Sequence, residues 1–214
     1  TVIAISRKTT ISPKKRPVLV SYKYNGKRYL KKPDENDLRL IQDINSFKPD
    51  SFFPIAEIPS GVKTGELIRM GYTEVSLLYT RRNLIIFSAL WNEMQSIPAL
   101  RFVLTSILVK TGSLLHNIGI KGGKINLAGA LPNALFVPSA LAERNIIELF
   151  IGKLDDIINM TPENLHRCCN QIQSATDLRN ISDDSVDYIF TDPPFGHNLM
   201  YSELNFIHDD WINI

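Results

Sequence analysis

The chain has 214 residues, of which 44% are hydrophobic and 21% are charged, and its formal net charge is +2. This length supports one sizeable domain, or one domain with a small appendage, and the composition excludes a wholly disordered protein. No apolar run reaches the roughly 20 residues that a membrane-spanning helix needs, and the N-terminus lacks a secretory pattern. We therefore expect a cytoplasmic protein with no membrane partner.

The first predicted elements are a hairpin and a helix. Strand-like residues 18–24 and 27–30 flank an Asn25-Gly26 pair, which predicts a β-hairpin. Basic residues are concentrated in residues 1–32, and this asymmetry permits contact with a phosphate backbone, although a solvated basic hairpin without chemistry is the favoured interpretation. An amphipathic helix is predicted to open at residues 33–35 and to end near residues 47–49.

A predicted linker and two predicted helices follow. Residues 50–71 are rich in Pro, Gly and Ser and predict an ordered loop or linker. We therefore divide the chain into residues 1–71, with the hairpin, helix and linker, and residues 72–214. In the second part, residues 82–95 and 99–110 predict two apolar helices.

A less regular region follows. Residues 111–138 contain several glycines and two prolines, which predict an irregular, exposed stretch. Ser139 is expected to cap a long amphipathic helix. The apolar residues of that helix recur at helical spacing and are expected to form core: Ile146, Ile147, Phe150, Ile151, Leu154, Ile157 and Ile158.

The C-terminal part predicts an α/β unit. Residues 171–175 are a plausible short strand, and residues 186–191 predict a buried strand that ends at Asp192. Proline cannot continue a central ladder, so Pro193 and Pro194 are placed at the carboxyl edge of the strand, where open parallel sheets hold their ligands. The fold class expected is therefore α/β, with a partial Rossmann-like sheet besides the N-terminal hairpin and the helical segments.

The two adjacent cysteines and the four histidines indicate no metal site. Cys168 and Cys169 are neighbours, which seldom bridge each other, and a single pair lacks the spacing of a zinc site. The histidines also lack ligand spacing, and residues 208–210 indicate a solvated helix face. We expect reduced thiols and no metal.

The residues after the predicted strand suit the chemistry of amine methylation. The lone pair of an exocyclic amine is delocalised into its base and must be redirected towards the methyl donor. The Asp192 carboxylate and the Pro193 carbonyl can each accept a hydrogen bond from the amine. Pro194 stiffens the loop, and Phe195 offers a face for a base turned out of its stack. A simple strand-terminating turn is the alternative interpretation.

Three C-terminal segments, residues 174–178, 183–196 and 200–204, together resemble the amino-methylating DNA methyltransferases of the large prokaryotic type. Such enzymes modify adenine N6 or cytosine N4, as in restriction-modification. The resemblance implies a Rossmann-like catalytic domain within residues 72–214, S-adenosylmethionine as cofactor and DNA as partner. It also implies a target-amine site made by Asp192, Pro193, Pro194 and Phe195.

The resemblance also suggests cofactor contacts. Residues 79–84 are similar to the family's threonine-x-lysine-proline-leucine segment beside the methionine moiety, with Arg82 in place of lysine and Asn83 in place of proline. This implies cofactor binding by Thr80, Arg82 and Asn83. Ser202 and Glu203 lie about ten residues beyond Asp192, close enough to border the pocket of Asp192 on its cofactor side. For all five residues, the start or cap of a helix is the alternative interpretation.

One family element is absent from the printed sequence. The family binds its cofactor through an Asp/Glu-x-Phe-x-Gly-x-Gly-like loop, and no such segment occurs among residues 1–214. We expect the chain to be a piece of a longer protein whose remainder carries that glycine-rich loop. Two alternatives remain open: a guanine-N2 methyltransferase of RNA, and a non-catalytic nucleic-acid-binding module of Rossmann-like fold.

Overall fold

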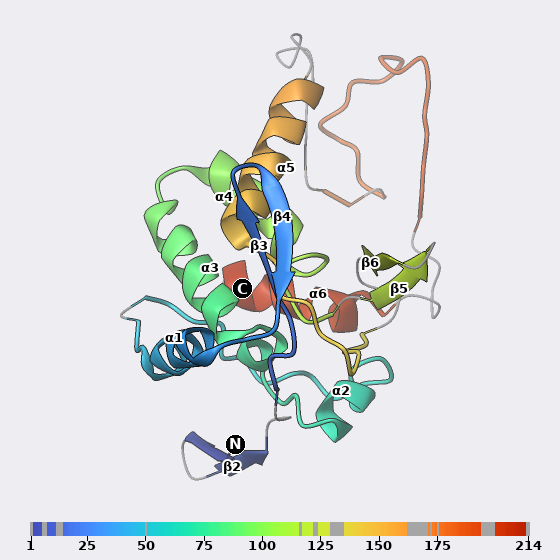
Figure 1. Cartoon of the computed structure of the whole chain (residues 1–214). Helices are drawn as coiled ribbons and strands as arrows, with labels where there is room; N and C mark the ends of the chain where they lie inside the picture. Colours follow the sequence, from blue (N-terminus) through green and yellow to red (C-terminus); the bar gives the residue numbers. More distant parts are fainter. Residues whose placement is uncertain are drawn as a thin grey trace.

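Helices surround one hydrophobic core in the computed structural model of the chain, and small hairpins lie around them (Figure 1). The strands described form three separate two-stranded antiparallel sheets and no parallel sheet. The expected mixture of helices and strands is thus present, while the Rossmann-like arrangement and the division at residue 71 stay predictions. The structure describes residues 2–5, 8–11, 15–49, 51–115, 117–121, 124–128, 135–161, 171, 173–174, 176–193 and 200–212.

The helices pack pairwise to form the body of the molecule: α4 lies against α5 and α6, and α3 lies against α1 and α5. None of the helices in these ranges combines the length and apolar character that a bilayer crossing requires. The elements in chain order are β1 (Val2–Ile5), β2 (Lys8–Ile11), β3 (Val20–Tyr24), β4 (Lys27–Lys31), α1 (Glu35–Ser46), α2 (Gly65–Arg69), η1 (Val75–Leu78), α3 (Arg81–Glu93), α4 (Pro98–Leu108), β5 (Asn117–Lys121), β6 (Lys124–Ala128), α5 (Ile146–Met160) and α6 (Tyr201–Ile212).

The N-terminal hairpin and helix are confirmed. Asn25 and Gly26 have φ angles of 47° and 74°, the left-handed pair that a tight hairpin turn between β3 and β4 requires. Asp34 caps α1 in a reciprocal capping box with Asp37. Lys31 at the end of β4 forms ion pairs with both carboxylates, at 2.7 and 2.8 Å, which ties the hairpin to the helix.

Two segments expected to be irregular contain regular structure. The predicted linker at 50–71 includes helix α2, in which Leu67 is fully buried. The predicted exposed stretch at 111–138 contains β5 and β6, and Leu114 and Val137 near its ends are buried. Burial of Leu67 in the common core stabilises helix α2, which local propensity does not predict.

Helix α5 begins later than expected. Asn145, and not Ser139, is its N-cap, because the Asn145 side chain accepts hydrogen bonds from the N–H groups of the first helical turn. Serine and asparagine are comparable caps, so the sequence does not choose between them. The expected core stripe is only partly confirmed: Ile146 and Phe150 are buried where α5 meets α3 and α4, whereas Ile158 is 62% exposed.

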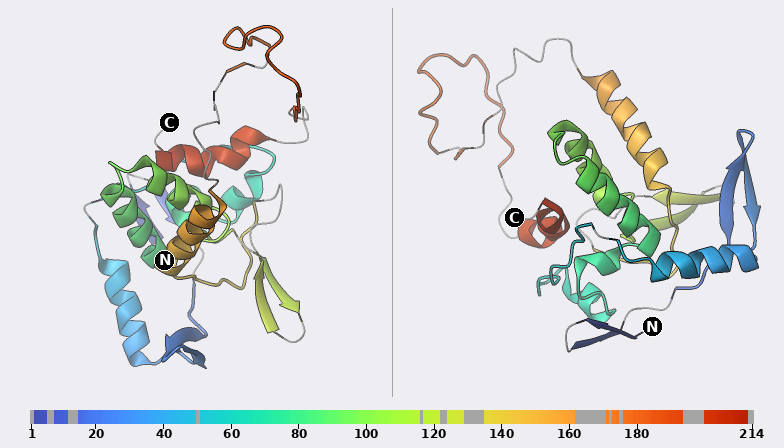
Figure 2. Two further views of the ribbon diagram at one scale, coloured as in Figure 1. Left: turned by 90° about the horizontal axis from the view of Figure 1, so that it is seen from above. Right: turned by 90° about the vertical axis from the view of Figure 1, so that its left-hand side faces the viewer.

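The expected buried strand at 186–191 is wrong. Residues 176–193, which we call the exposed segment, contain no helix or strand, and in both views of Figure 2 their trace loops away from the helical body. Tyr188 and Phe190 are 80% and 81% exposed. A strand needs a neighbour for its backbone N–H and C=O groups, and the described residues offer none. In the expected strand at 171–175, Gln171, Gln173 and Ser174 are not extended into a sheet, and residues 172 and 175 lie outside the described residues.

Trp211 of α6 is the centre of the core. Its ring is fully buried, and its indole N–H donates to the Tyr79 hydroxyl at 3.0 Å. Three aromatic rings from two other parts of the chain surround it at centroid distances of 5.6 to 6.1 Å: Phe52 from the loop before α2, and Phe87 and Trp91 from α3. Helix α6 is thereby packed onto α3 and onto Tyr79, which precedes it.

Trp211→Ala should lower the free energy of unfolding by about 3–5 kcal/mol, because it opens a cavity among four rings and leaves the Tyr79 hydroxyl without its donor. Chemical denaturation followed by circular dichroism measures the change. Phe102→Ala on α4 is the control, since Phe102 is 67% exposed and its loss should cost about 0.5 kcal/mol or less. Equal costs for the two variants would contradict the central role of Trp211.

Candidate functional site

The predicted target-amine site lies at the end of the exposed segment. Asp192 and Pro193 are exposed, and neither belongs to a helix or strand. Pro194 and Phe195 lie outside the described residues. Helix α6 begins at Tyr201, so the Asp-Pro-Pro-Phe sequence lies a few residues before a helix that is packed into the core.

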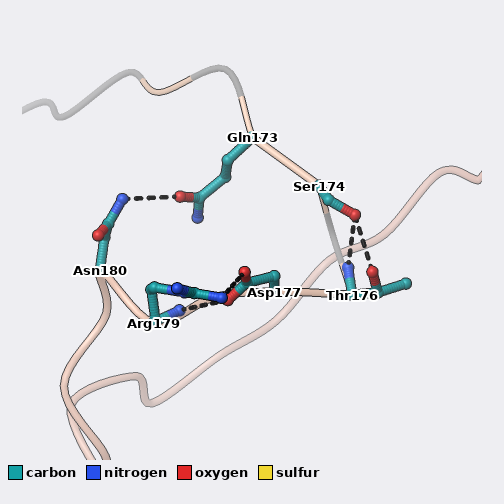
Figure 3. A network of polar contacts seen from close by, with 6 residues as sticks. All are labelled: Gln173, Ser174, Thr176, Asp177, Arg179 and Asn180. Atoms are coloured by element: carbon teal, nitrogen blue, oxygen red, sulfur yellow. Dashed lines mark hydrogen bonds and ion pairs between the residues drawn. The ribbon is translucent and has the colours of Figure 1, made fainter.

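The polar side chains upstream of Asp192 bind one another (Figure 3). Arg179 holds Asp177 through two hydrogen bonds of 2.9 and 2.5 Å, and Asn180 donates to Gln173 at 3.1 Å. The Ser174 and Thr176 hydroxyls are 2.8 Å apart. All these partners are close in sequence, so the network shapes a local turn and does not attach the segment to the helical body.

Thr80 and Asn83 have structural roles at the start of α3. Thr80 is the N-cap, and its hydroxyl accepts a hydrogen bond from the Asn83 N–H at 3.3 Å. The Asn83 side chain is buried and donates to the Gly112 carbonyl at 3.3 Å. Both side chains therefore use polar groups that a cofactor contact would require, in line with the alternative interpretation of this segment as a helix start.

Arg82, in the first turn of α3, is exposed. Its guanidinium forms an ion pair with Glu143, which lies before α5. It also borders an open pocket of about 350 Å³ between α1 and α3, whose other lining residues are Asp43, Ile44, Phe47, Ile85 and Ile86. This lining suits a small apolar group beside a guanidinium.

Glu203 of α6 binds a loop far away in the sequence. Its Oε2 accepts hydrogen bonds from the Lys63 N–H at 2.6 Å, the Thr64 N–H at 3.2 Å and the Thr64 hydroxyl at 3.3 Å. We call residues 61–64 the anchor loop. Gly61 is needed for this approach, because a Cβ atom there would lie 2.2 Å from the Glu203 carboxyl carbon. The contact fixes the first turn of α6.

The anchor loop also sets the charge state of Glu203. Desolvation by itself would raise the pKa of its carboxyl, but hydrogen bonds from the backbone N–H groups of Lys63, Thr64 and Val62 outweigh it, and the pKa lies below its ordinary value of 4.5. The loop therefore binds the carboxylate in preference to the neutral acid. The alternative interpretation of Glu203 as a helix-start residue agrees with this contact, whereas Ser202 beside it is exposed.

The structure separates the two groups of predicted cofactor residues. Glu203 contacts the anchor loop, and the α6 residue that reaches the segment of Thr80 is Trp211, through Tyr79. Eight residues of helix span about 12 Å, so Ser202 and Glu203 lie at the far end of α6 from Thr80. Among the residues described, no group of His, Cys, Asp and Glu side chains could hold a metal ion.

Two further contacts of α6 were not predicted from the sequence. Residues 208–210 are not simply a solvated face: the Asp210 carboxylate accepts from the Ala56 N–H at 3.0 Å, and the His208 ring lies 3.3 Å from the Thr105 carbonyl. Helical spacing is the sequence feature that could have indicated this side of the helix, because Glu203, Ile207 and Asp210 recur three or four residues apart along α6.

Glu203→Gln should destabilise the chain at neutral pH, and the difference from the parent should vanish in acid. A lowered folded-state pKa means that the stabilisation is complete above the unfolded value near 4.5 and is lost as the pH falls through the folded value. Denaturation of parent and variant at a series of pH values measures this. Glu93→Gln, which removes an exposed carboxylate from α3, is the control. A pH-independent difference would contradict the charge assignment.

Gly61→Ala should destabilise the chain by displacing the Glu203 carboxylate. Gly65→Ala, four residues on, is the matched control, since an added Cβ there meets nothing within 4 Å. It should be neutral, or stabilising by up to about 1 kcal/mol through the loss of backbone entropy in the unfolded chain. Thermal melts of the parent and both variants measure the effect. Equal melting temperatures for the two variants would contradict the role assigned to Gly61.

The comparisons with known proteins add no relative. No family model matches the chain, and neither a curated protein nor a solved structure matches it. The candidate site therefore depends on the residues themselves and on the positions that the fold gives them.

Proposed function

We propose that this chain carries the target-amine half of a site that methylates an exocyclic amine of DNA, adenine N6 or cytosine N4, with S-adenosylmethionine as methyl donor. The observation that carries the proposal is the sequence Asp192-Pro193-Pro194-Phe195 placed shortly before α6. That helix is held near its start by Glu203 and near its end by Trp211. A loop that must present acceptors in fixed positions benefits from such a support.

The residues of the motif have complementary roles in the proposed reaction. The Asp192 carboxylate and the Pro193 carbonyl each accept one amine hydrogen, which draws the nitrogen towards tetrahedral geometry and frees its lone pair. Pro194 keeps the loop stiff, and Phe195 stacks on the target base once that base has left the DNA double helix. No strong base is required, because the amine proton leaves after the nitrogen has been methylated.

The cofactor requires more than this chain provides. Thr80, Asn83 and Glu203 already bind polar groups of the protein, and of the five predicted cofactor residues only Arg82 lines the pocket between α1 and α3. We therefore expect S-adenosylmethionine to depend on a glycine-rich loop outside the printed sequence, and cofactor binding by the five residues stays a prediction.

The exposed segment supports the presence of such a further part. Val186, Tyr188, Ile189 and Phe190 are all at least half exposed, directly before the motif. A contiguous apolar run of this kind is unfavourable in water and indicates a surface that another part of the protein covers. The portion with the glycine-rich loop is the proposed cover, which would bring the cofactor beside Asp192.

Asp192→Ala should reduce methyl transfer to DNA by at least about 100-fold while cofactor affinity is unchanged, because one acceptor of the amine is lost and no cofactor contact is. Radiolabelled methyl transfer with the complete protein measures the rate, and calorimetry measures cofactor affinity. Asp187→Ala removes another exposed carboxylate of the same segment and is the matched control. Parent-like activity of Asp192→Ala would refute the assignment.

Two further outcomes of this assay separate the alternatives. Methylation of structured RNA in preference to DNA would contradict the DNA assignment and favour the guanine-N2 reaction. Absence of S-adenosylmethionine binding by the complete protein would contradict catalysis and favour a non-catalytic nucleic-acid-binding module.

A further inference from the structure

The β3–β4 hairpin presents two distinct faces. Strand registers place Tyr22 opposite Tyr29 and Tyr24 opposite Lys27 on one face, with Lys23 opposite Arg28 on the other. All of these residues are exposed, and the hairpin stands beside the helical body and is not covered by it (Figures 1 and 2). Because so little of the hairpin is buried, packing against the core does not explain its aromatic and basic residues.

The turn end of the hairpin carries positive charge on both faces, with Lys23 and Arg28 on one face and Lys27 on the other. Two cations directly opposite each other on neighbouring strands destabilise a hairpin. Glu148 of α5 relieves half of this repulsion through an ion pair with Lys23 at 3.0 Å. Arg28 and Lys27 form no ion pair with any residue that the structure describes. These two cations at the turn are therefore available to an anion.

The opposite face, which we call the tyrosine face, stiffens the ribbon and extends its contact area. Tyr22 and Tyr29 stack with their centroids 5.6 Å apart and their planes at 22°. Tyr24, nearest the turn, is 65% exposed. Stacked rings opposite each other stabilise the pairing of two strands that have no third neighbour.

We propose that the β3–β4 hairpin is a DNA-binding ribbon that inserts its turn into the major groove of duplex DNA, with Lys27 and Arg28 on the flanking phosphates. The groove is about 12 Å wide and admits a two-stranded ribbon. The deep, narrow major groove of duplex RNA does not, so the geometry favours DNA. The choice of partner rests on the proposed function, whereas the charge and shape of the ribbon do not.

The test is the salt dependence of binding to a short fluorescein-labelled DNA duplex, measured by anisotropy for the parent and for Lys27→Gln/Arg28→Gln. Both side chains are exposed, so the fold should survive, which circular dichroism checks. Loss of two phosphate contacts should lower the slope of log K against log salt by about 1.8. Arg69→Gln/Lys110→Gln removes two exposed cations elsewhere and should leave the slope unchanged.

Several results would overturn the inference: no DNA binding by the parent, equal slopes for the parent and the hairpin variant, an equal fall in the control variant, or tighter binding of duplex RNA. Failure of the proposed function is distinguishable. If Asp192→Ala abolishes methylation while the hairpin variant binds DNA normally, only the hairpin inference fails. If the hairpin variant loses binding while the complete parent transfers no methyl group, only the proposed function fails.

Discussion

Trp211 donates its indole N–H to the Tyr79 hydroxyl while its ring packs against Phe52, Phe87 and Trp91. This contact joins the last described helix to elements that precede it by more than a hundred residues. Because the indole is fully buried, its N–H must find an acceptor, and Tyr79 provides it immediately before α3. The direction of α6 is thereby determined.

The anchor loop completes this constraint at the other end of α6. Glu203 accepts two backbone N–H groups and one hydroxyl, and Gly61 has no side chain that would obstruct it. A residue that was expected to border the cofactor side of the pocket thus holds the helix that follows the motif in sequence. In the proposed function its contribution would be to position α6.

The chain is well packed where its elements have partners and exposed where they do not. Ile158 at the end of α5 and Phe190 before the motif are both largely exposed, although Ile158 was expected to be core from its helical spacing and Phe190 from its place in a predicted buried strand. Periodicity predicts which residues share a face, but it does not say whether a partner surface is present. For the same reason the sequence predicts the β3–β4 hairpin but does not indicate that Glu148 of α5 forms an ion pair with Lys23.

The sequence by itself determined the local elements whose signals are complete within a few residues. Asn25-Gly26 predicts the hairpin turn, residues 33–35 predict the start of α1, and the residue types of Asp192 to Phe195 suggest their chemistry. Only the tertiary structure decided that Asn145 caps α5, that Glu203 binds the anchor loop, and that residues 186–191 form no strand. These outcomes depend on which surfaces meet, and contacts between residues far apart in the chain leave no mark in local propensity or periodicity.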